Sequence, residues 1–288
     1  MTKTIIGVMG GSGLYQMDAL TEAREQMIDT PFGCPSDVIV TGRVAGVEVA
    51  FLARHGRGHR FIPTEVPYQA NIYALKSLGV RYLISISAVG SLCEEIRPLD
   101  MVLPDQFIDL TKYRASTFFG NGAVAHVSMA QPICPVLSDL LAQAVESQNF
   151  TDFKLHRGGT YVCIEGPSFS TIAESRWYRS LGASVIGMTN MPEAKLAREA
   201  QIAYATLALT TDYDCWHPKE AHVTAGMAIA NLMKNAERAQ RVLISAVSLV
   251  SQAPPQSIAH TALDSGLVTI PDSMSAEARK RLDALLRK

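Results

Sequence analysis

The sequence predicts an α/β fold in which a β-sheet is covered by helices on both faces and is followed by a helical C-terminal tail. Over roughly the first 250 residues, short runs rich in β-branched residues alternate with longer segments of helical periodicity. The chain has 288 residues, of which 48% are hydrophobic and 18% are charged, enough for a large core. This composition excludes an intrinsically disordered chain.

The strands and helices of this sheet can be placed in chain order. The segments with the pattern of strands are Thr4–Met9, Val47–Ala53, Arg81–Ser87, Thr160–Ile164, Ser184–Gly187 and Ala203–Thr210. The helical segments between them are Tyr68–Leu78, Val136–Glu146, Ile172–Leu181 and Glu193–Ala200. Thr171 and Glu174 have the spacing of a capping box, and Gly182 stands where a glycine commonly ends a helix.

A long alanine-rich helix is expected over Glu220–Val250, and Pro254-Pro255 ends it because proline cannot continue a helix. We therefore expect one domain over residues 1–251 and a linker with a helical appendage over residues 252–288. Within the appendage, Ser275–Arg287 has the pattern of a short amphipathic helix. No second core is evident, so we expect the appendage to pack on a neighbouring subunit.

The charge balance and the cysteines exclude several classes of protein. Lys and Arg total 26 and Asp and Glu total 27, a net charge of −1 that argues against a nucleic-acid partner. The apolar run Ile5–Met9 meets glycines too soon for an export signal, and Val242–His260 contains prolines, so no membrane segment is predicted. The cysteines form no C-x-x-C pair, which favours a cytoplasmic enzyme with reduced thiols over a disulfide framework or a metal site; they are Cys34, Cys93, Cys134, Cys163 and Cys215.

Gly10-Gly11-Ser12-Gly13 follows the first predicted strand, where backbone N–H groups and the Ser12 hydroxyl could hold an anion. A Walker loop would end in Gly-Lys-Ser/Thr, and a dinucleotide fingerprint starting at Gly11 would need glycine in place of Gln16. Both motifs are absent, which argues against a nicotinamide-dependent oxidoreductase. The loop is either a tight turn or a phosphate cradle.

The stretch from Arg54 to Arg60 places five basic or titratable side chains within seven residues. The arginine fork suits phosphate oxygens, and a histidine can donate a hydrogen bond from its ring. His55 and His59 have the spacing of a helical metal pair, but the glycines between them disfavour a helix and no Glu follows His55. The stretch is either an anion site or a solvated surface loop.

Three further stretches follow predicted strands, where ligands enter open α/β sheets. They are Ser85–Ser91, Glu165–Ser170 and Gly187–Glu193. Phe169 could stack on a flat ring, and Met188 and Thr189 could present a thioether to a sugar and a hydroxyl to an anion. Each stretch also has a simpler interpretation as a turn or a core residue.

Asp212 and Asp214 end the last predicted strand and are two residues apart, so on an extended segment they face the same way. Two carboxyls crowded into an apolar site raise each other's pKa, and one can stay protonated near neutral pH. Such an acid can donate a proton to a leaving group. A turn or helix-cap role is the alternative.

Taken together, these stretches resemble the trimeric purine nucleoside phosphorylases, and among them most closely the enzymes that cleave 5′-methylthioadenosine. The resemblance covers residues 4 to 250. It rests on Gly10-Gly11-Ser12-Gly13-Leu14, Asp29-Thr30-Pro31-Phe32-Gly33, Leu52-Ala53-Arg54-His55-Gly56-Arg57, Tyr68-Gln69-Ala70-Asn71, Ile164-Glu165-Gly166-Pro167 and Thr211-Asp212-Tyr213-Asp214-Cys215-Trp216. It implies the nucleoside phosphorylase fold, a central mixed and twisted β-sheet flanked by helices.

The resemblance also implies site residues. Phosphate would be surrounded by Ser12, Arg54, His55, Ser87, Ala88 and Thr189. The nucleoside would be bound by Phe169, Ser170, Met188, Thr211, Asp212, Asp214, Ala225 and Ala228, with His59 of a neighbouring subunit closing the 5′ pocket. The catalytic residues would be Asp212, Asp214 and His55. Family members that act on 6-oxopurines usually place Asn where Asp212 stands, so this residue favours an adenine nucleoside.

The implied reaction is phosphorolysis of 5′-methylthioadenosine to adenine and 5-methylthioribose 1-phosphate, a pentosyl transfer in purine and methionine salvage. Phosphate would be a co-substrate, with no organic cofactor and no metal, and the enzyme would be a homotrimer, a hexamer being left open. Two alternatives remain. One is a purine nucleoside or methylthioinosine phosphorylase that prefers 6-oxopurines, and the other is a non-catalytic nucleoside-binding protein on the same fold.

Overall fold

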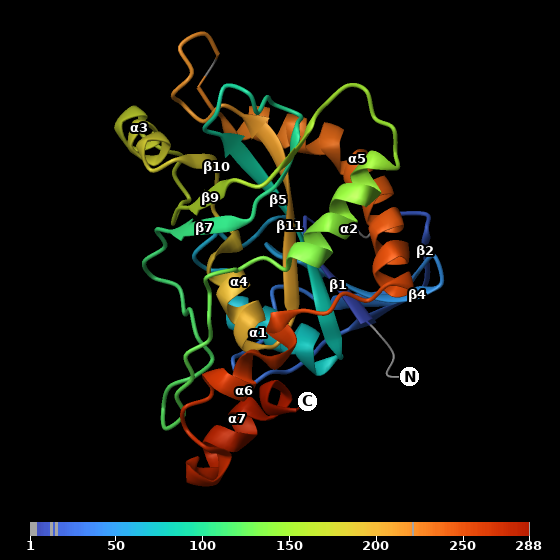
Figure 1. Cartoon of the computed structure of the whole chain (residues 1–288), viewed down its shortest axis with the longest axis vertical. Helices are drawn as coiled ribbons and strands as arrows, with labels where there is room; N and C mark the ends of the chain where they lie inside the picture. The colour runs from blue at the N-terminus through green and yellow to red at the C-terminus, as the bar shows by residue number, and fades with distance from the viewer. Residues whose placement is uncertain (1–4, 12–13, 15–16, 221, 288) are drawn as a thin grey trace.

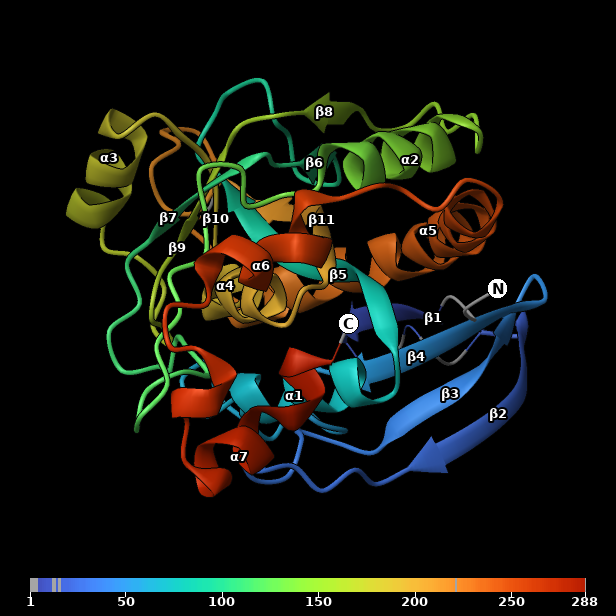
Figure 2. The same cartoon turned by 60° about the horizontal axis from the view of Figure 1, so that its bottom comes forward.

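The computed structural model describes residues 5–11, 14, 17–220 and 222–287, which form a β-sheet between layers of helices (Figure 1). Helices α2 (Pro135–Glu146) and α5 (Ala225–Gln252) pack on each other and on strand β11 (Ala203–Asp212). Helix α1 (Tyr68–Ser77) lies on the other side of the central strands, where it contacts α4 (Asn190–Glu199), as Figure 2 shows. Every residue of β11 is buried, as expected for a strand covered on both faces. The predicted fold class is confirmed.

The described residues form an 11-stranded mixed sheet in which β5 is the branch point. One path runs β2-β3-β4-β1-β5-β10-β9-β7, while β11 lies along the other edge of β5 and leads to β6 and β8. Besides β11, the strands are β1 (Ile5–Gly10), β2 (Leu20–Gln26), β3 (Ile39–Val44), β4 (Val47–Ala53), β5 (Val80–Ser91), β6 (Met101–Leu103), β7 (Gln106–Asp109), β8 (Leu155–Arg157), β9 (Thr160–Cys163) and β10 (Ala183–Gly187). Strands β4, β1, β5 and β11 are mutually parallel, so their carboxyl ends meet at one edge of the sheet.

The predicted elements are confirmed with small shifts at their ends. Strand β4 has the predicted bounds, whereas β5 extends four residues beyond the predicted Ser87 to Ser91. Helix α3 (Ile172–Ser180) begins with the predicted capping box, because Thr171 Oγ1 accepts the Glu174 N–H at 3.2 Å and the Glu174 carboxylate accepts the Thr171 N–H at 2.8 Å. Gly182 follows the helix in the left-handed region, with φ +74°.

Helix α5 begins five residues later than predicted. Thr224 caps it by accepting the Met227 N–H at 3.2 Å on its hydroxyl oxygen, and the helix ends at Gln252, two residues before Pro254. Sequence periodicity alone missed strands β2, β3, β6, β7 and β8. Strand β2 is an edge strand whose side chains are mostly exposed and polar, and β6, β7 and β8 are only three or four residues long.

The tail packs on its own chain, which differs from the expectation that it would pack on a neighbouring subunit. It contains α6 (Ala262–Gly266), α7 (Ala276–Leu286) and two short 3₁₀ turns at Ile258–Thr261 and Pro271–Ser273. Helix α7 contacts α1 and buries Ala278, Leu282, Ala284 and Leu285. The Gln201 side chain also donates a hydrogen bond to the Leu285 carbonyl at 3.2 Å. The apolar side of α7 therefore belongs to the main core, and the division at residue 251 stays a prediction.

Replacing Leu282 with Ala tests this packing. Leu282 is fully buried, so Leu282→Ala is expected to lower the free energy of unfolding by about 2–5 kcal/mol. The matched control is Val268→Ala, because Val268 is 60% exposed and its loss should change stability little. Urea unfolding measures both variants. A Leu282→Ala protein with wild-type stability would place the side chain outside the core.

Candidate active site

The candidate site lies at a gap along one edge of β5. Strand β1 pairs with β5 as far as Met9 opposite Ser85, and β10 pairs from Ile186 opposite Gly90. The stretch of β5 between these two pairs faces the ends of β1 and β10 instead of lying between paired strands. Ala88 in this stretch is exposed although its neighbours in β5 are buried. This is the position at which the strand order of the sheet changes, where open α/β sheets bind ligands.

Arg54 enters this gap from the end of β4. Its Nε donates to Glu193 Oε2 at 2.6 Å and its Nη2 to Glu193 Oε1 at 3.0 Å, and the two side chains are only 3% and 0% exposed. Burial acts to lower the pKa of Arg54, but the Glu193 carboxylate more than offsets this effect. The pKa of Arg54 is therefore raised, and the guanidinium keeps its charge. The arginine fork is therefore occupied by a carboxylate and is not free for phosphate.

One part of the Arg54 guanidinium stays available for an anion. Nη1 donates to the Ile86 carbonyl at 3.0 Å, and Nη2 also donates to Ser85 Oγ at 2.7 Å. Nη1 carries a second N–H, which has no partner among the described residues. Arg54 can thus offer one N–H and a positive charge to a ligand in the gap.

The predicted hydroxyls lie together beside this arginine. Ser87 Oγ on β5 is 3.2 Å from Oγ1 of Thr189, two residues beyond the end of β10. The backbone N–H of Arg54 donates to the Gly10 carbonyl at 2.9 Å, so the start of the glycine turn lies beside these hydroxyls. Ser12 lies outside the described residues, so its contact with phosphate stays a prediction.

His55 is held as a neutral ring. Its Nδ1 lies 2.8 Å from the Phe61 carbonyl and must carry the proton, which leaves Nε2 as an acceptor. Burial lowers the pKa of His55 to about 4, and the charge of Arg54 acts in the same direction. His55 can therefore accept a hydrogen bond in the site at neutral pH but cannot donate one from Nε2, contrary to the donor role that the sequence suggested.

His59 lies on His55 of the same chain. The two rings stack with centroids 4.2 Å apart and an interplanar angle of 16°. The sequence-based expectation placed His59 at a neighbouring subunit's site, whereas the tight turn between Gly56 and Gly58 folds it back onto its own chain. The role of His59 in nucleoside binding stays a prediction.

Asp212 ends β11 opposite Gly90 of β5 and is 4% exposed. Its Oδ1 accepts the Asp214 N–H at 2.8 Å and its Oδ2 accepts the Thr211 hydroxyl at 2.6 Å. Burial raises the pKa of Asp212 to about 6, although these hydrogen bonds act in the opposite direction. The carboxyl can therefore hold a proton close to neutral pH, as the sequence predicted.

The Thr211 hydroxyl can serve both protonation states of Asp212. Thr211 Oγ1 lies 2.6 Å from the Asp212 carboxyl and 3.2 Å from the Val89 carbonyl. When Asp212 is ionised, Thr211 donates to it. When Asp212 is protonated, Asp212 can donate to Thr211 and the threonine proton turns to Val89, so neither state leaves a buried polar group unpaired.

The second acid and the predicted base-binding residues lie on the neighbouring loops. Burial also raises the pKa of Asp214, which sits in the left-handed region at φ +53°. The Ser170 carbonyl accepts from Cys215 Sγ at 3.3 Å, which joins the 165–170 stretch to the acid loop. Ser170 Oγ is buried beside Asp214, where its hydroxyl acts to lower the pKa of that carboxyl, and Phe169 is 41% exposed. A buried hydroxyl and an exposed ring beside a buried acid are suited to a heteroaromatic ligand.

Arg114 holds two of these loops and was not predicted from the sequence. Its buried guanidinium donates to the carbonyls of Glu165 and Met188 at 2.6 Å each and to the Met191 carbonyl at 2.7 Å. The Glu165 carboxylate accepts from Arg114 at 3.1 Å and from Thr64 at 2.5 Å. Arg114 therefore fixes the backbone at Met188, the predicted ribose contact.

Ala225 and Ala228 lie at the start of α5, the first exposed and the second partly buried. Three residues further on, the Asn231 side chain donates to the Thr211 carbonyl at 2.7 Å. Residues three apart share a helix face, so Ala228 lies on the side of α5 that faces the acid strand. A contact of either alanine with a nucleoside stays a prediction.

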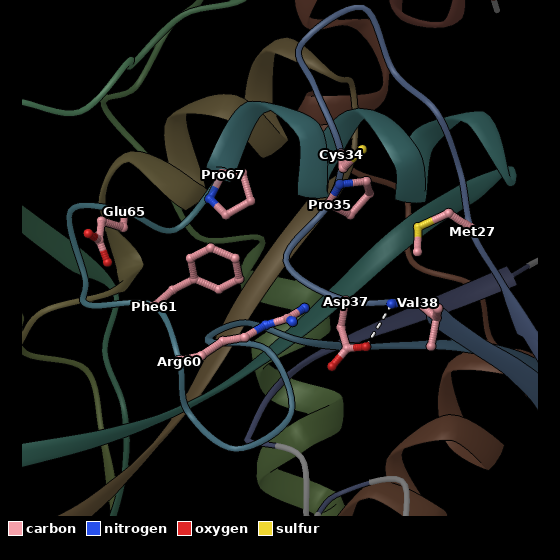
Figure 3. Close-up of a pocket in the computed structure, with 9 residues that line it drawn as sticks. All are labelled: Met27, Cys34, Pro35, Asp37, Val38, Arg60, Phe61, Glu65 and Pro67. Carbon is pink, nitrogen blue, oxygen red and sulfur yellow. Dashed lines mark hydrogen bonds between the residues drawn. The ribbon is translucent and has the colours of Figure 1, made fainter.

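A surface pocket of about 420 Å³ adjoins the histidine turn (Figure 3). It is lined by Met27, Cys34, Pro35, Asp37, Val38, Arg60, Phe61, Glu65 and Pro67, which include no site residue predicted from the sequence. Phe61 is shared between the two places, because its carbonyl holds His55 while its ring faces the pocket.

Two features are absent from the part of the chain that the structure describes. There, no three His, Cys, Asp or Glu side chains are grouped so that they could hold a metal ion. In the same part of the chain, no helix is both long and apolar enough to span a bilayer.

A model of the phosphorylase superfamily matches residues 5–248, most of the chain. The chain belongs to this superfamily. Similar members include proteins named S-methyl-5′-thioadenosine phosphorylase from Thermosynechococcus vestitus, 57% identical over 98% of both chains, and from Synechocystis, 58% identical over 100% of this chain and 88% of the relative.

Solved structures of superfamily members agree with the fold. A methylthioadenosine phosphorylase from an Antarctic soil metagenomic library is 63% identical and has a TM-score of 0.96, with 100% of both chains covered. A methylthioadenosine phosphorylase from Schistosoma mansoni in complex with adenine is 34% identical and has a TM-score of 0.87, covering 92% of this chain and 99% of that chain.

Two buried residues of this superfamily member complete the site without having been assigned a role from the sequence. Glu193 pairs with Arg54, and the Tyr204 hydroxyl donates to Glu193 at 2.9 Å. Glu193 stood in a stretch already noted, but a carboxylate near a predicted anion site gives no signal that it neutralises an arginine 139 residues away. Tyr204 has the pattern of an ordinary core residue in a buried strand.

Proposed function

We propose that the chain catalyses phosphorolysis of 5′-methylthioadenosine to adenine and 5-methylthioribose 1-phosphate. The observation that carries the proposal is the placement of Asp212, a buried acid with a raised pKa, at the same gap in β5 as Arg54 and the two hydroxyls. The names of the similar superfamily members and the complex of one of them with adenine support the choice of nucleoside.

The reaction breaks the C1′–N9 bond and forms a bond from C1′ to a phosphate oxygen. As the first bond lengthens, positive charge grows on the ribose and the electron pair moves to the purine. Asp212 would donate its proton to N7 of the leaving adenine. General acid catalysis of this kind raises the rate by about 10²- to 10⁴-fold. Asp214 would address the 6-amino group, which makes the pair selective for adenine.

Phosphate would lie beneath C1′, held by Arg54, Ser87, Thr189 and, as predicted, Ser12. Its negative charge would stabilise the developing cation, and the remaining Nη1 N–H of Arg54 would help to hold it there. A neutral His55 would accept a hydrogen bond from the P–O–H group of monohydrogen phosphate. That proton would pass to solvent as the ester forms its dianion, and solvent would return a proton to Asp212. Holding the two reactants together can supply on the order of 7–11 kcal/mol of the barrier.

The remaining assignments follow from the same resemblance. Phe169 and Ser170 would line the purine, Met188 the ribose, and Ala225, Ala228 and His59 the 5′-methylthio group. Phosphate is then a co-substrate, and neither an organic cofactor nor a metal takes part. The enzyme would act in the cytoplasm as a homotrimer.

Release of adenine tests the proposal directly. With 5′-methylthioadenosine, adenine should form only when phosphate is added, and 5-methylthioribose 1-phosphate should appear in equal amount. The same assay with adenosine, inosine and 5′-methylthioinosine should give slower cleavage of both 6-oxopurines. Faster cleavage of inosine would favour the 6-oxopurine alternative, and nucleoside binding without cleavage would favour a non-catalytic protein.

A further inference from the structure

Tyr161 of β9 reaches the phosphate side of the gap although nothing in the sequence distinguished it from a core residue. Its side chain is fully buried, and its ring packs edge-on against Phe107 of β7 with centroids 5.6 Å apart. Gly187 at the end of β10 makes room for it. A Cβ built on Gly187 would lie 1.9 Å from the Tyr161 hydroxyl oxygen, so only glycine leaves this space open.

The Tyr161 hydroxyl lies against the two hydroxyls assigned to phosphate. It is 3.1 Å from Ser87 Oγ, which in turn is 3.2 Å from Thr189 Oγ1. Each hydroxyl carries one proton, and phosphate oxygens need donors. If the Ser87 hydroxyl donated its proton to Tyr161 or to Thr189, it could not donate to an anion.

The surroundings of Tyr161 favour the phenol as the donor in its bond with Ser87. Burial raises its pKa, so the phenol keeps its proton and remains a donor at neutral pH. The Tyr161 hydroxyl lies 3.1 Å from Ser87 Oγ, and the nearby Thr189 hydroxyl acts to lower its pKa; both residues are predicted phosphate contacts. The phenol proton is therefore available for Ser87 Oγ.

We propose that Tyr161 is a positioning residue that donates its single phenol proton to Ser87 Oγ and thereby leaves the Ser87 proton free to point toward the bound phosphate. The proposal rests on the proposed function, because it assumes that phosphate occupies the gap. Tyr161 itself does not touch substrate. Gly187 is also needed for this arrangement, because any side chain there would push the Tyr161 phenol away from Ser87.

Tyr161→Phe tests the proposal by steady-state kinetics with phosphate and 5′-methylthioadenosine varied separately. The KM for phosphate is expected to rise about tenfold, the effect of about one hydrogen bond, while the KM for the nucleoside changes less than twofold. A loss of packing alone would not separate the two constants. Stabilisation of the folded protein by inorganic phosphate, measured as the rise in Tm, should weaken in parallel.

Two further variants complete the test. Gly187→Ala keeps the phenol but displaces it, and should raise the phosphate KM in the same way; it also covers the case in which Tyr161→Phe does not fold. Tyr82→Phe is the matched control, because it removes another buried phenol whose hydroxyl donates to the Pro255 carbonyl at 3.1 Å, and it should leave both KM values unchanged.

The outcomes separate this proposal from the proposed function. If wild type shows phosphate-dependent cleavage but both site variants keep its phosphate KM, the role of Tyr161 is refuted while the function stands. An equal rise in both KM values would mean a purely structural role and would also refute the proposal. If wild type releases no adenine with phosphate, both proposals fail together.

Discussion

Asp212→Asn is expected to lower turnover of 5′-methylthioadenosine by about 10²- to 10⁴-fold, because an amide cannot protonate the leaving adenine. The substitution fits the local hydrogen bonds. The Asn oxygen can accept the Asp214 N–H, and its NH₂ can donate to Thr211, whose proton then turns to the Val89 carbonyl 3.2 Å away. The loss of rate should therefore come from chemistry, which a thermal unfolding curve on the same sample checks.

The same variant should shift the base preference toward 6-oxopurine nucleosides. The ratio of kcat/KM for 5′-methylthioinosine to that for 5′-methylthioadenosine measures the shift. Glu199→Gln is the matched control, because Glu199 is another buried acid with a pKa raised by burial but contacts Thr117 and Phe118 instead of the site. It should keep the wild-type ratio. An Asp212→Asn enzyme with unchanged activity and selectivity would remove this residue from the mechanism.

Asp212 should also make stability depend on pH in a defined direction. Its pKa is raised from 3.8 to about 6 on folding, so the folded chain binds this proton more tightly than the unfolded chain does. The contribution of this proton to the free energy of unfolding is fully present below about pH 3.8 and is lost as the pH rises through about 6. Above that pH, the buried charge costs on the order of 3 kcal/mol.

Asp212→Asn removes this cost while abolishing most activity. Relative to wild type, the variant should gain stability as the pH is raised from 5 to 8, which urea unfolding at both values measures. Cleavage by wild type should fall as the pH rises above the pKa of the acid, whereas the residual activity of the variant should lack this decline. A wild-type stability that rises from pH 5 to 8 in step with that of the variant would contradict the raised pKa.

The sequence predicts the central sheet well because its strands are buried on both faces. Val49–Ala53 is entirely apolar, and in Ala203–Thr210 only two threonines interrupt the apolar residues. Apolar segments of this length are typical of strands buried on both faces of a sheet. Strand β2 could not be predicted in this way, because Leu20–Gln26 is mostly polar. It is a strand because it pairs with β3, and β3 was not predicted either, since Gly42 interrupts its apolar residues. The position of α7 could not be predicted either, because its apolar face fits this core or a partner's equally well.

The site shows the same division between local and distant information. Arg54 and Asp212 could be predicted because their residue type, position at a strand end and neighbours in sequence all point to an anion and an acid. Their partners could not. The charge of Arg54 is balanced by Glu193, and the hydroxyl of Ser87 is oriented by Tyr161, across 139 and 74 residues respectively. Only the order of the strands brings these pairs together.

The Arg54–Glu193 pair allows the binding and the folding roles of Arg54 to be separated. Arg54→Met should abolish productive phosphate binding, with kcat/KM for phosphate lowered by about 10²- to 10³-fold. It also leaves Glu193, which is fully buried, without its counter-charge, and this should lower the free energy of unfolding by about 3–5 kcal/mol. A loss of activity in this variant alone would therefore be ambiguous.

The double variant Arg54→Met/Glu193→Gln resolves the two effects. Removing both charges should restore much of the stability, because the cost of Arg54→Met comes mostly from the unpaired carboxylate. It should not restore phosphate dependence, since the positive charge at the gap is still missing. Phosphate titrations and urea unfolding on the wild type, both single variants and the double variant complete the cycle. Recovery of phosphate binding together with stability would show that Arg54 acts only by supporting the fold, and the anion site would then have to lie elsewhere along β5.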